Sequence, residues 1–575
     1  MRILLVASAY NSLTQRVHAE LRNRGHAVAV EVTPAGRDVV AAVDRHDPEL
    51  IVAPLLKTAV PREVWTARTC LIVHPGPVGD RGPSSLDWAV HEDAAEWGVT
   101  VLQAEEEMDA GPVWATAEFP VPRTGKSDLY RGEVSDAALD AVLTAVERFA
   151  SGRHSPTAQG GAPTAQGGAP AAPGARARPP MRQETRRIAW ADDPTATVLR
   201  KLRAADSQPG VLDVLLGGEW FLHGGRPEPR LRGRPGELLA TRAGAVCRAT
   251  VDGAVWIPEL RARTGPGVPR ACKLPATHAL AGRLPRLPEL SVPPLCPAGD
   301  GAPWSDITYR EDGPVGTLSF SFPGGAMSTG HCRRLLAAYR AACERPTSVL
   351  VLGGTRDFFS NGIHLGVIEA APDPAAESWA NINAMDDLVE AVLTTTDRLV
   401  VAAIGGNAAA GGVMLALAAD EVWCRSGSVL NPHYRLMGLY GSEYWTYSLP
   451  RRVGAATAER LVREALPVCA GQARDIGLAD RVIECPPARF SAEVTRLAQH
   501  WAGSSGAQSR LVAKKAESER REAVTPLAAV RERELAHMRR IFLDPGAPYH
   551  ALRRAFVRKQ PSPARPAVPH EVADA

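Results

Sequence analysis

A histidine and an aspartate near the start of the chain have the side-chain types that acyl-group chemistry needs. His74 follows the apolar run 70–73 in the segment LIVHPGPVGDRGPSSLDWAV, and Asp109 lies in WGVTVLQAEEEMDAGPVWA. A histidine at the end of a strand can stabilise the oxyanion of a tetrahedral intermediate and shuttle a proton. A nearby carboxylate with a raised pKa can hold the imidazole and relay protons. Taken singly, each residue is better explained as a strand-end or turn residue, but together they predict one acid–base pair.

The last third of the chain contains two glycine-bearing loops, FFSNGIHLGVIE and VVAAIGGNAAAGGVMLALAADEVW. Stabilising an acyl oxygen with the backbone requires two N–H groups that point at that one oxygen. Gly411 and Gly412 would let the backbone approach it closely, and the N-terminus of the helix that follows would add positive potential. A Gly-Gly pair alone commonly reflects helix–sheet packing, whereas two such loops in this order favour an oxyanion site.

Composition limits the classes of function. The chain has 575 residues, 45% hydrophobic and 22% charged, which is enough for three or four globular domains. A formal net charge of +3 without a long basic stripe argues against a nucleic-acid partner. Nine cysteines without a C-x-x-C pair predict reduced thiols in the cytoplasm and no metal site. Neither a signal peptide nor an apolar run of about 18 residues is present, so we expect no membrane association.

Strand and helix patterns alternate over residues 1–150. Strands are predicted at 3–7, 27–32, 49–53 and 70–73, and helices at 12–24 and 128–150. This alternation is typical of a parallel sheet with helices on its faces.

The remaining sequence divides by composition. Residues 151–183 contain the heptad PTAQGGA twice and are too polar to bury a core, so we predict a disordered linker. Short strand patterns over 184–285 predict a small β-barrel domain. A proline-rich linker at 286–304 precedes a second α/β domain at 305–545, which leaves a tail at 546–575.

The region around His74 and Asp109 resembles the active-site region of the N10-formyltetrahydrofolate-dependent formyltransferases. That family carries Asn-x-His, an Arg-Gly turn and Leu-Asp-x-Gly, and His74, Arg81–Gly82 and the segment MDAG stand at the matching places here. The segment RRIAWADDPTATVLRKLRAADSQPGVLDVLLGGEW is similar to the family's barrel-like C-terminal domain. The resemblance implies a folate bound near Arg81 and Gly82. Ile72 replaces the family's asparagine, so one expected donor to the oxyanion is missing.

Residues 305–545 resemble the crotonase (enoyl-CoA hydratase/isomerase) superfamily. The resemblance implies that the N–H groups of Ile363 and Gly411 form the oxyanion hole for a thioester. The two hydratase glutamates are not intact: one position is Met414, and the other falls at His433 or Tyr434. Simple hydration is therefore not expected. The polar candidates left are Tyr434 and Glu443, with His433 in reserve; otherwise Tyr434 is a core tyrosine and Glu443 a solvated loop carboxylate.

The two halves together resemble the HypX/HoxX family of [NiFe]-hydrogenase maturation factors, with VHPGPVGDRGPSSLDWA, LNPHYRLMGLYGSEYWTY and YHALRRAFVRK as the specific segments. The resemblance implies a multidomain α/β fold: an N-terminal Rossmann-like parallel-sheet formyltransferase domain, a small OB-like β-barrel and a C-terminal crotonase-like α/β spiral. It also implies that N10-formyltetrahydrofolate formylates coenzyme A, that formyl-CoA is decarbonylated to carbon monoxide, and that the partner is the hydrogenase large subunit or its maturation machinery.

Charged segments of the sequence contain candidate cations for binding the CoA phosphates. The candidates are Arg131, Arg539–Arg540 and Lys514–Lys515, although runs of charge are usually solvated helix faces. Three other functions remain open: formyl transfer to another acceptor such as an amino sugar or peptide amine, hydrolysis of formyl-tetrahydrofolate to formate, and a non-catalytic CoA- or folate-binding scaffold. The presence of His74, Asp109 and both loops argues against the scaffold, which needs none of them.

Overall fold

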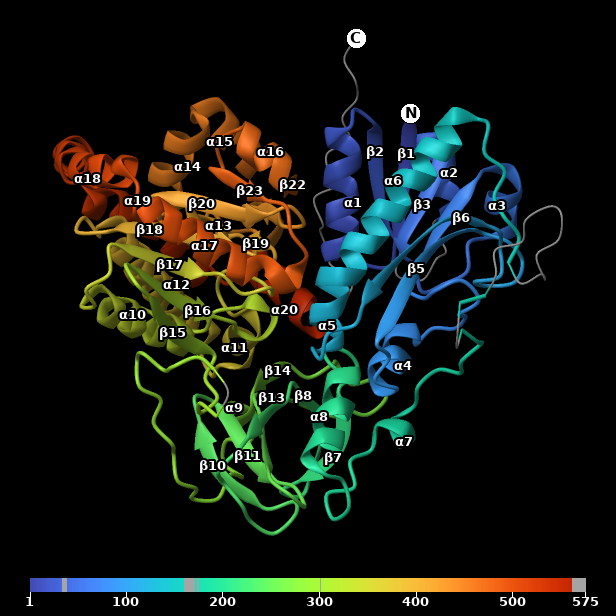
Figure 1. Ribbon diagram of the computed structural model, residues 1–575, viewed down its shortest axis with the longest axis horizontal. Coiled ribbons are helices and arrows are strands. Elements are labelled where there is room, and N and C mark those ends of the chain that lie inside the picture. The colour runs from blue at the N-terminus through green and yellow to red at the C-terminus, as the bar shows by residue number, and fades with distance from the viewer. Residues whose placement is uncertain (34–38, 160–170, 173–174, 300, 561–575) are drawn as a thin grey trace. The chain divides into compact units, whose positions relative to one another are not determined.

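The chain forms two compact parts. The computed structural model (Figure 1) describes residues 1–33, 39–159, 171–172, 175–299 and 301–560. One part contains residues 1–187 and 200–209, and the other contains residues 188–199 and those described from 210 onward. No helix within these described ranges combines the length and the apolarity needed to cross a bilayer.

A six-stranded sheet in the order β2-β1-β3-β4-β5-β6 lies at the centre of the first part. The strands are β1 (Arg2–Ala7), β2 (Ala27–Val32), β3 (Leu50–Leu55), β4 (Cys70–His74), β5 (Glu96–Gln103) and β6 (Val113–Pro120). β1 to β4 pair in parallel, but β5 is antiparallel to both β4 and β6. The predicted parallel sheet is therefore mixed. The antiparallel pairing of β5 with β6 follows from their short connection, 104–112, because parallel neighbours require a longer crossover.

Side chains of β1 alternate between two apolar layers, which explains why helices cover both faces of the sheet. Ile3 and Leu5 pack with α1 and α6, whereas Leu4 and Val6 pack with α2 and α3. In Figure 1, α1 and α6 run across one face of this sheet. The helices are α1 (Ser12–Asn23), α2 (Val39–His46), α3 (Arg62–Ala67), α4 (Ser85–His91), α5 (Lys126–Leu129), α6 (Ser135–Ser151) and α7 (Gln183–Arg186), with a π-helical turn at Tyr130–Val134.

The second part begins with two four-stranded antiparallel sheets, β10-β11-β12-β9 and β14-β13-β8-β7, where the sequence predicts a small β-barrel. The elements are β7 (Val211–Leu215), β8 (Gly218–His223), β9 (Arg226–Glu228), β10 (Leu238–Arg242), β11 (Ala245–Ala249), β12 (Ala254–Ile257), β13 (Glu259–Ala262), β14 (Lys273–Pro275) and α9 (Ala276–Ala279), with α8 (Thr195–Ala204) before them. Trp256 of β12 is fully buried in their core.

A second six-stranded sheet follows, in the order β15-β16-β17-β18-β20-β23, and it is parallel except for the first pair. A small sheet, β19-β21-β22, lies beside the second glycine loop. The strands are β15 (Ile307–Asp312), β16 (Val315–Phe320), β17 (Val349–Gly353), β18 (Leu399–Ile404), β19 (Ala408–Ala409), β20 (Glu421–Arg425), β21 (Val429–Asn431), β22 (Val468–Cys469) and β23 (Arg481–Ile483).

Helices alternate with these strands along the chain. They are α10 (Thr329–Cys343), α11 (Leu365–Ala370), α12 (Pro374–Leu393), α13 (Gly411–Leu417), α14 (Trp445–Val453), α15 (Ala455–Glu464), α16 (Ala470–Asp475), α17 (Phe490–Ala502), α18 (Ser505–Val524), α19 (Leu527–Leu543) and α20 (Pro548–Arg558). The C-terminal residues predicted to be a tail thus begin with a helix, and those after 560 lie outside the described residues.

Candidate active sites

The first site is centred on His74, the last residue of β4. Its ring is 4% exposed, and its Nδ1 lies 3.4 Å from Oδ1 of Asp109. Asp109 comes from the loop between β5 and β6, where its backbone has a φ of 57°. Asp109 and His74, which the sequence predicts as a pair, therefore lie next to each other.

A second carboxylate, which sequence reasoning missed, contacts the other nitrogen of the same ring. Oδ2 of Asp80 lies 3.0 Å from Nε2 of His74. Asp80 is buried, and its Oδ1 accepts a hydrogen bond of 2.5 Å from Nη1 of Arg178. Arg178 also pairs with Glu92 at 3.0 Å. The sequence signal that could have identified Asp80 is its position directly before the Arg-Gly turn.

The two carboxylates decide the charge of His74. Burial alone would lower the pKa of the imidazole, but hydrogen bonds with Asp109 and Asp80 raise it to about 9. Burial also opposes the ionisation of Asp109, but its bond with His74 and the N–H of Gly82 hold the pKa of this carboxyl below its usual value. The expectation of a raised pKa for Asp109 is therefore wrong, because the neighbouring cation stabilises the carboxylate.

The Arg-Gly turn serves the site through its backbone. The N–H of Gly82 donates to Oδ2 of Asp109 at 3.2 Å. Gly82 has a φ of 115°, and a Cβ there would lie 2.3 Å from the carbonyl oxygen of Arg178, so only glycine fits. The Arg81 guanidinium points to Glu107 at 2.6 Å on the surface. Arg131 lies in the π-helical turn between α5 and α6, and its role in binding CoA stays a prediction.

Both ends of the predicted disordered linker are structured, in contrast to the expectation. Gln159 donates to the carbonyl oxygens of Asp109 and Gly111 at 2.9 and 2.8 Å, and it accepts from the N–H of Gly79 at 3.2 Å. Arg178 at the other end contacts Asp80. Most of the repeated heptad lies outside the described residues.

The second site joins Tyr434 and Glu443, both buried. The Tyr434 hydroxyl donates to Oε2 of Glu443 at 2.9 Å. A Cβ added to Gly411 would lie only 2.1 Å from Oε1 of the same carboxylate. Glu443 is therefore not a solvated loop residue, because its carboxylate fills the space over the second glycine loop.

The two glycine loops meet beneath this carboxylate. The N–H of Ala409 donates to the carbonyl oxygen of Ser360 at 2.8 Å, and a Cβ on Gly362 would lie 3.3 Å from the nitrogen of Gly411. Ala410 has a φ of 47°, which turns the backbone sharply before α13. Among the hydrogen bonds of the described ranges, none uses the N–H of Ile363 or of Gly411, so both groups remain available for an oxyanion.

Two further buried acids, neither of them predicted, hold Glu443 in place. Asp386 of α12 accepts from the N–H of Glu443 at 2.9 Å and from the hydroxyl of Ser442. Glu534 of α19 accepts from the N–H groups of Tyr444 and Thr446, each at 2.8 Å. Glu443 and Tyr444 have φ values of 59° and 60°, so these acids fix a left-handed turn that non-glycine residues rarely adopt.

Burial governs the protonation of these acids. It raises the pKa of Glu443 to about 7 and that of Glu534 to about 7. Burial and the nearby Glu443 raise the pKa of Asp386 well above its usual value, which favours its neutral form. Burial also raises the pKa of Tyr434 well above its usual value.

The other candidate site residues of the second part are buried, neutral or already in contact with another side chain. Met414 is buried in α13. Burial lowers the pKa of His433 to about 4, so its ring is neutral. Lys514 is paired with Asp420 at 2.6 Å, and the Arg539 guanidinium lies 5.9 Å from the ring centre of Trp379.

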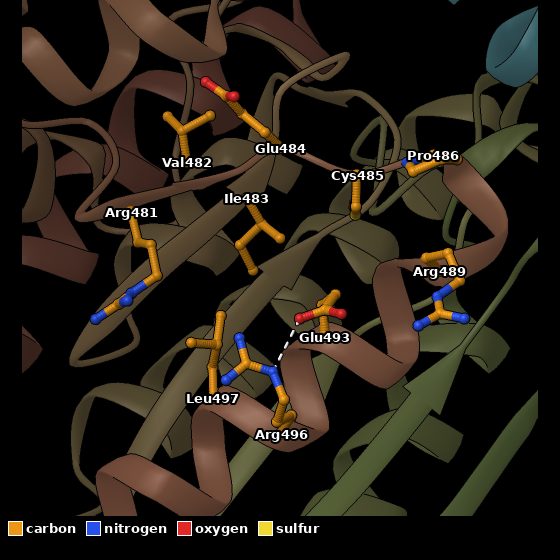
Figure 2. A pocket seen from close by; sticks show the side chains of 10 residues that line it. All are labelled: Arg481, Val482, Ile483, Glu484, Cys485, Pro486, Arg489, Glu493, Arg496 and Leu497. Carbon is orange, nitrogen blue, oxygen red and sulfur yellow. Dashed lines mark hydrogen bonds and ion pairs between the residues drawn. The ribbon is translucent and has the colours of Figure 1, made fainter.

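A pocket at β23 belongs to neither site. Figure 2 shows it beside Arg481, Arg489 and Arg496, with Arg496 paired to Glu493 at 3.0 Å. Its lining residues include none of the predicted catalytic or cofactor-binding residues.

The hydrogen bonds of Asp386 predict different changes in thermal stability for two substitutions. Asp386→Asn keeps an acceptor for the Glu443 N–H and a partner for Ser442, so thermal stability should change little. Asp386→Ala leaves both groups buried and unpaired and should cost about 2 kcal/mol or more. Calorimetric melting at pH 7 checks this, with Asp387→Ala as the control, because Asp387 is 48% exposed in its ion pair with Arg531. Equal losses for Asp386→Asn and Asp386→Ala would contradict the neutral role.

Family models match two segments of the chain. The model of the formyl transferase C-terminal domain matches residues 180–269, and that of enoyl-CoA hydratase/isomerase matches residues 325–546. A methionyl-tRNA formyltransferase of Geobacillus thermodenitrificans is 25% identical over 220 residues, which are 37% of this chain and 65% of that protein.

Two relatives match the chain nearly from end to end. The hydrogenase maturation factor HoxX of Bradyrhizobium diazoefficiens is 47% identical over 567 residues, 98% of this chain and 96% of that protein. The crystal structure of HypX from Aquifex aeolicus in complex with tetrahydrofolic acid is 41% identical with a TM-score of 0.93, covering 100% of this chain and 99% of the other. The chain therefore belongs to the HypX/HoxX family of hydrogenase maturation factors.

Proposed function

We propose that this maturation factor makes carbon monoxide for the [NiFe] site of a hydrogenase in two steps. The His74–Asp109 site transfers the formyl group of N10-formyltetrahydrofolate to the thiol of coenzyme A. The Tyr434–Glu443 site then decarbonylates formyl-CoA and regenerates CoA. The tetrahydrofolate bound to the Aquifex relative supports a folate substrate, and the enoyl-CoA hydratase/isomerase match supports a thioester in the second part.

The observation that carries the proposal is the position of Glu443 over Gly411. In this fold the oxyanion hole polarises a thioester carbonyl, so a group directly above it faces the acyl carbon. The carboxylate oxygen occupies the volume of a Gly411 Cβ. A formyl thioester carries only a hydrogen on its acyl carbon, and this is the atom a base at Glu443 would meet.

The residues support a balanced decarbonylation. Glu443 takes the formyl proton, the C–H electron pair becomes the carbon lone pair of CO, and the C–S pair leaves with sulfur. A protonated Glu443, with a pKa of about 7, can then protonate a thiolate whose thiol has an ordinary pKa of about 8.5. The net products are CO and CoA.

In this proposal Tyr434 acts as a hydrogen-bond partner of Glu443. Its hydroxyl has a pKa raised well above the usual value, so it is a poor direct acid for the departing sulfur. Its bond to Oε2 of Glu443 leaves Oε1 facing Gly411. We therefore assign Tyr434 the task of orienting the base, and Glu443 that of moving the proton from carbon to sulfur.

We also propose which residues hold CoA and which partner receives the carbon monoxide. CoA is a retained cofactor, and Arg131 and Arg539 remain the candidates for its phosphates. Lys514 is a weaker candidate because Asp420 already neutralises its ammonium group. The partner is the hydrogenase large subunit or another component of its maturation machinery.

Removing the imidazole tests the first step. His74→Ala should slow the release of tetrahydrofolate from the formyl donor by about 10²-fold or more, the usual range for a lost acid–base group. Stopped-flow absorbance with CoA present measures this rate. His26→Ala, in the turn after α1, is the control. Equal donor consumption by His74→Ala and the parent protein would remove His74 from the reaction.

Conservative changes test the second step. Glu443→Gln and Tyr434→Phe should each lower CO release by about 10²-fold, while tetrahydrofolate is still formed. The parent's rate of CO release should rise with pH through about 7, because Glu443 must be ionised to accept the formyl proton. CO is measured by haem absorbance, with Glu459→Gln and Tyr447→Phe as controls. Undiminished CO from both variants would place the chemistry elsewhere, and formate as the sole parent product would favour the hydrolase alternative.

A further inference from the structure

Asp80 has no task in the formyl transfer described so far, yet it is the most deeply buried charged group around His74. Its side chain is 0% exposed, against 14% for Asp109. Its two oxygens are divided between Nε2 of His74 and Nη1 of Arg178. A carboxylate is buried in this way only where specific partners compensate for its lost hydration.

The contact between Asp80 and His74 requires a glycine beside it. A Cβ on Gly76 would lie 2.4 Å from Oδ2 of Asp80 and 2.5 Å from Nε2 of His74. Any other residue at this position would push into the hydrogen bond. The backbone of the loop after β4 is therefore fitted to this pair of side chains.

The two carboxylates differ in what they leave available. Asp80 binds Nε2 at 3.0 Å from the buried side, whereas Asp109 approaches Nδ1 at 3.4 Å from the more exposed side. The Nδ1–H group can therefore donate to a substrate atom while Nε2 keeps its hydrogen bond to Asp80.

We propose that Asp80, held by Arg178, is a positioning residue that keeps His74 positively charged, and that this charge selects a thiolate over an amine as formyl acceptor. The inference rests on the proposed formyl transfer and specifies the chemical class of its acceptor. The charge of His74 also compensates for Ile72, which replaces the family's asparagine. A site without that side-chain amide obtains its oxyanion stabilisation from a charged imidazole.

The charged groups around the ring are consistent with this role. Asp80 and Asp109 face His74, and Arg178 faces Asp80. Glu92 pairs with the other end of Arg178, and Arg81 with Glu107. The two carboxylates in direct contact with the ring exceed the cations in contact with it, so the imidazolium is the favoured form, in agreement with its pKa of about 9.

A charged His74 suits a thiolate because that reaction needs an acid. The thiolate attacks the formyl carbon and forms a C–S bond, and the imidazolium stabilises the oxyanion. The C–N10 bond then breaks as Nδ1 delivers its proton to N10. The products are the formyl thioester, tetrahydrofolate and neutral His74, so charge and atoms balance. A proton released when the next thiol ionises restores the imidazolium.

An amine acceptor needs a base in place of an acid. Its attack produces an ammonium group in the tetrahedral intermediate, and a base must remove that proton before the formyl amide can form. His74 is already protonated, and the low pKa of Asp109 makes this carboxylate a poor base. The same surroundings that favour a thiolate therefore disfavour an amine.

The ionisation of His74 can be measured without any turnover. We expect the NMR signal of ¹³Cε1-labelled His74, assigned by its loss in His74→Ala, to keep the imidazolium shift at pH 7 and to titrate near 9. Asp80→Asn should lower that midpoint by about one pH unit or more, since an opposite charge is removed from the ring. Asp47→Asn, at an exposed aspartate with a φ of 40°, is the matched control. A neutral His74 in the parent protein at pH 7 would overturn the proposal, even if Asp80→Asn does not fold.

The acceptor class is tested with one pair of probes. Full-length protein and formyl donor are given either pantetheine or its analogue with an amine in place of the thiol, at pH 7.5. Tetrahydrofolate release should be at least about 10²-fold faster with the thiol, and Asp80→Asn should narrow that ratio. Comparable rates with both acceptors would contradict thiolate selection. A protein that never releases CO but shows a charged His74 and the thiol preference would refute the decarbonylation while leaving this inference intact.

Discussion

The close approach of the Glu443 carboxylate to Gly411 is the constraint on which the second half of the structure depends. No side chain other than glycine fits beneath it, because a Cβ would lie 2.1 Å from Oε1. To reach this position the chain must adopt two consecutive left-handed residues, 443 and 444. Such residues cost on the order of 1–3 kcal/mol each and persist only where their surroundings hold them. Here α12 and α19 each contribute one buried acid that accepts hydrogen bonds from the turn.

The buried carboxylates of the two sites differ in the protonation state that their surroundings favour. Around His74, two carboxylates contact one imidazole, and this pairing outweighs burial and favours the charged forms. Around Glu443, three acids lie close together, and burial favours their protonated forms. The first arrangement produces an acid and the second a base with a pKa near neutrality. This division fits the two proposed steps, of which the first protonates nitrogen and the second takes a proton from carbon.

Local signals made much of this architecture predictable. The alternation of short apolar runs indicated the parallel core β1 to β4, and the His74, Asp109 and two-loop motifs indicated both sites. The residues that sequence reasoning missed act over long separations: Asp386 and Glu534 lie 57 and 90 positions from the residues whose N–H groups they bind. Arg178 lies 98 positions from Asp80, in a segment whose composition resembled a linker. Such pairings are created by tertiary packing, so neither periodicity nor composition reveals them. The pKa of Asp109 was misjudged for the same reason, since it depends on the charge of His74.

The proposed reaction carries one carbon atom from folate through a thioester to carbon monoxide. It is tested most directly by supplying ¹³C-formyl-tetrahydrofolate with CoA to the full-length protein and following the label. The reaction should release ¹³CO in a one-to-one ratio with tetrahydrofolate and leave the CoA pool unchanged at its end. Label recovered as formate or as a stable formyl adduct, with no ¹³CO, would contradict it.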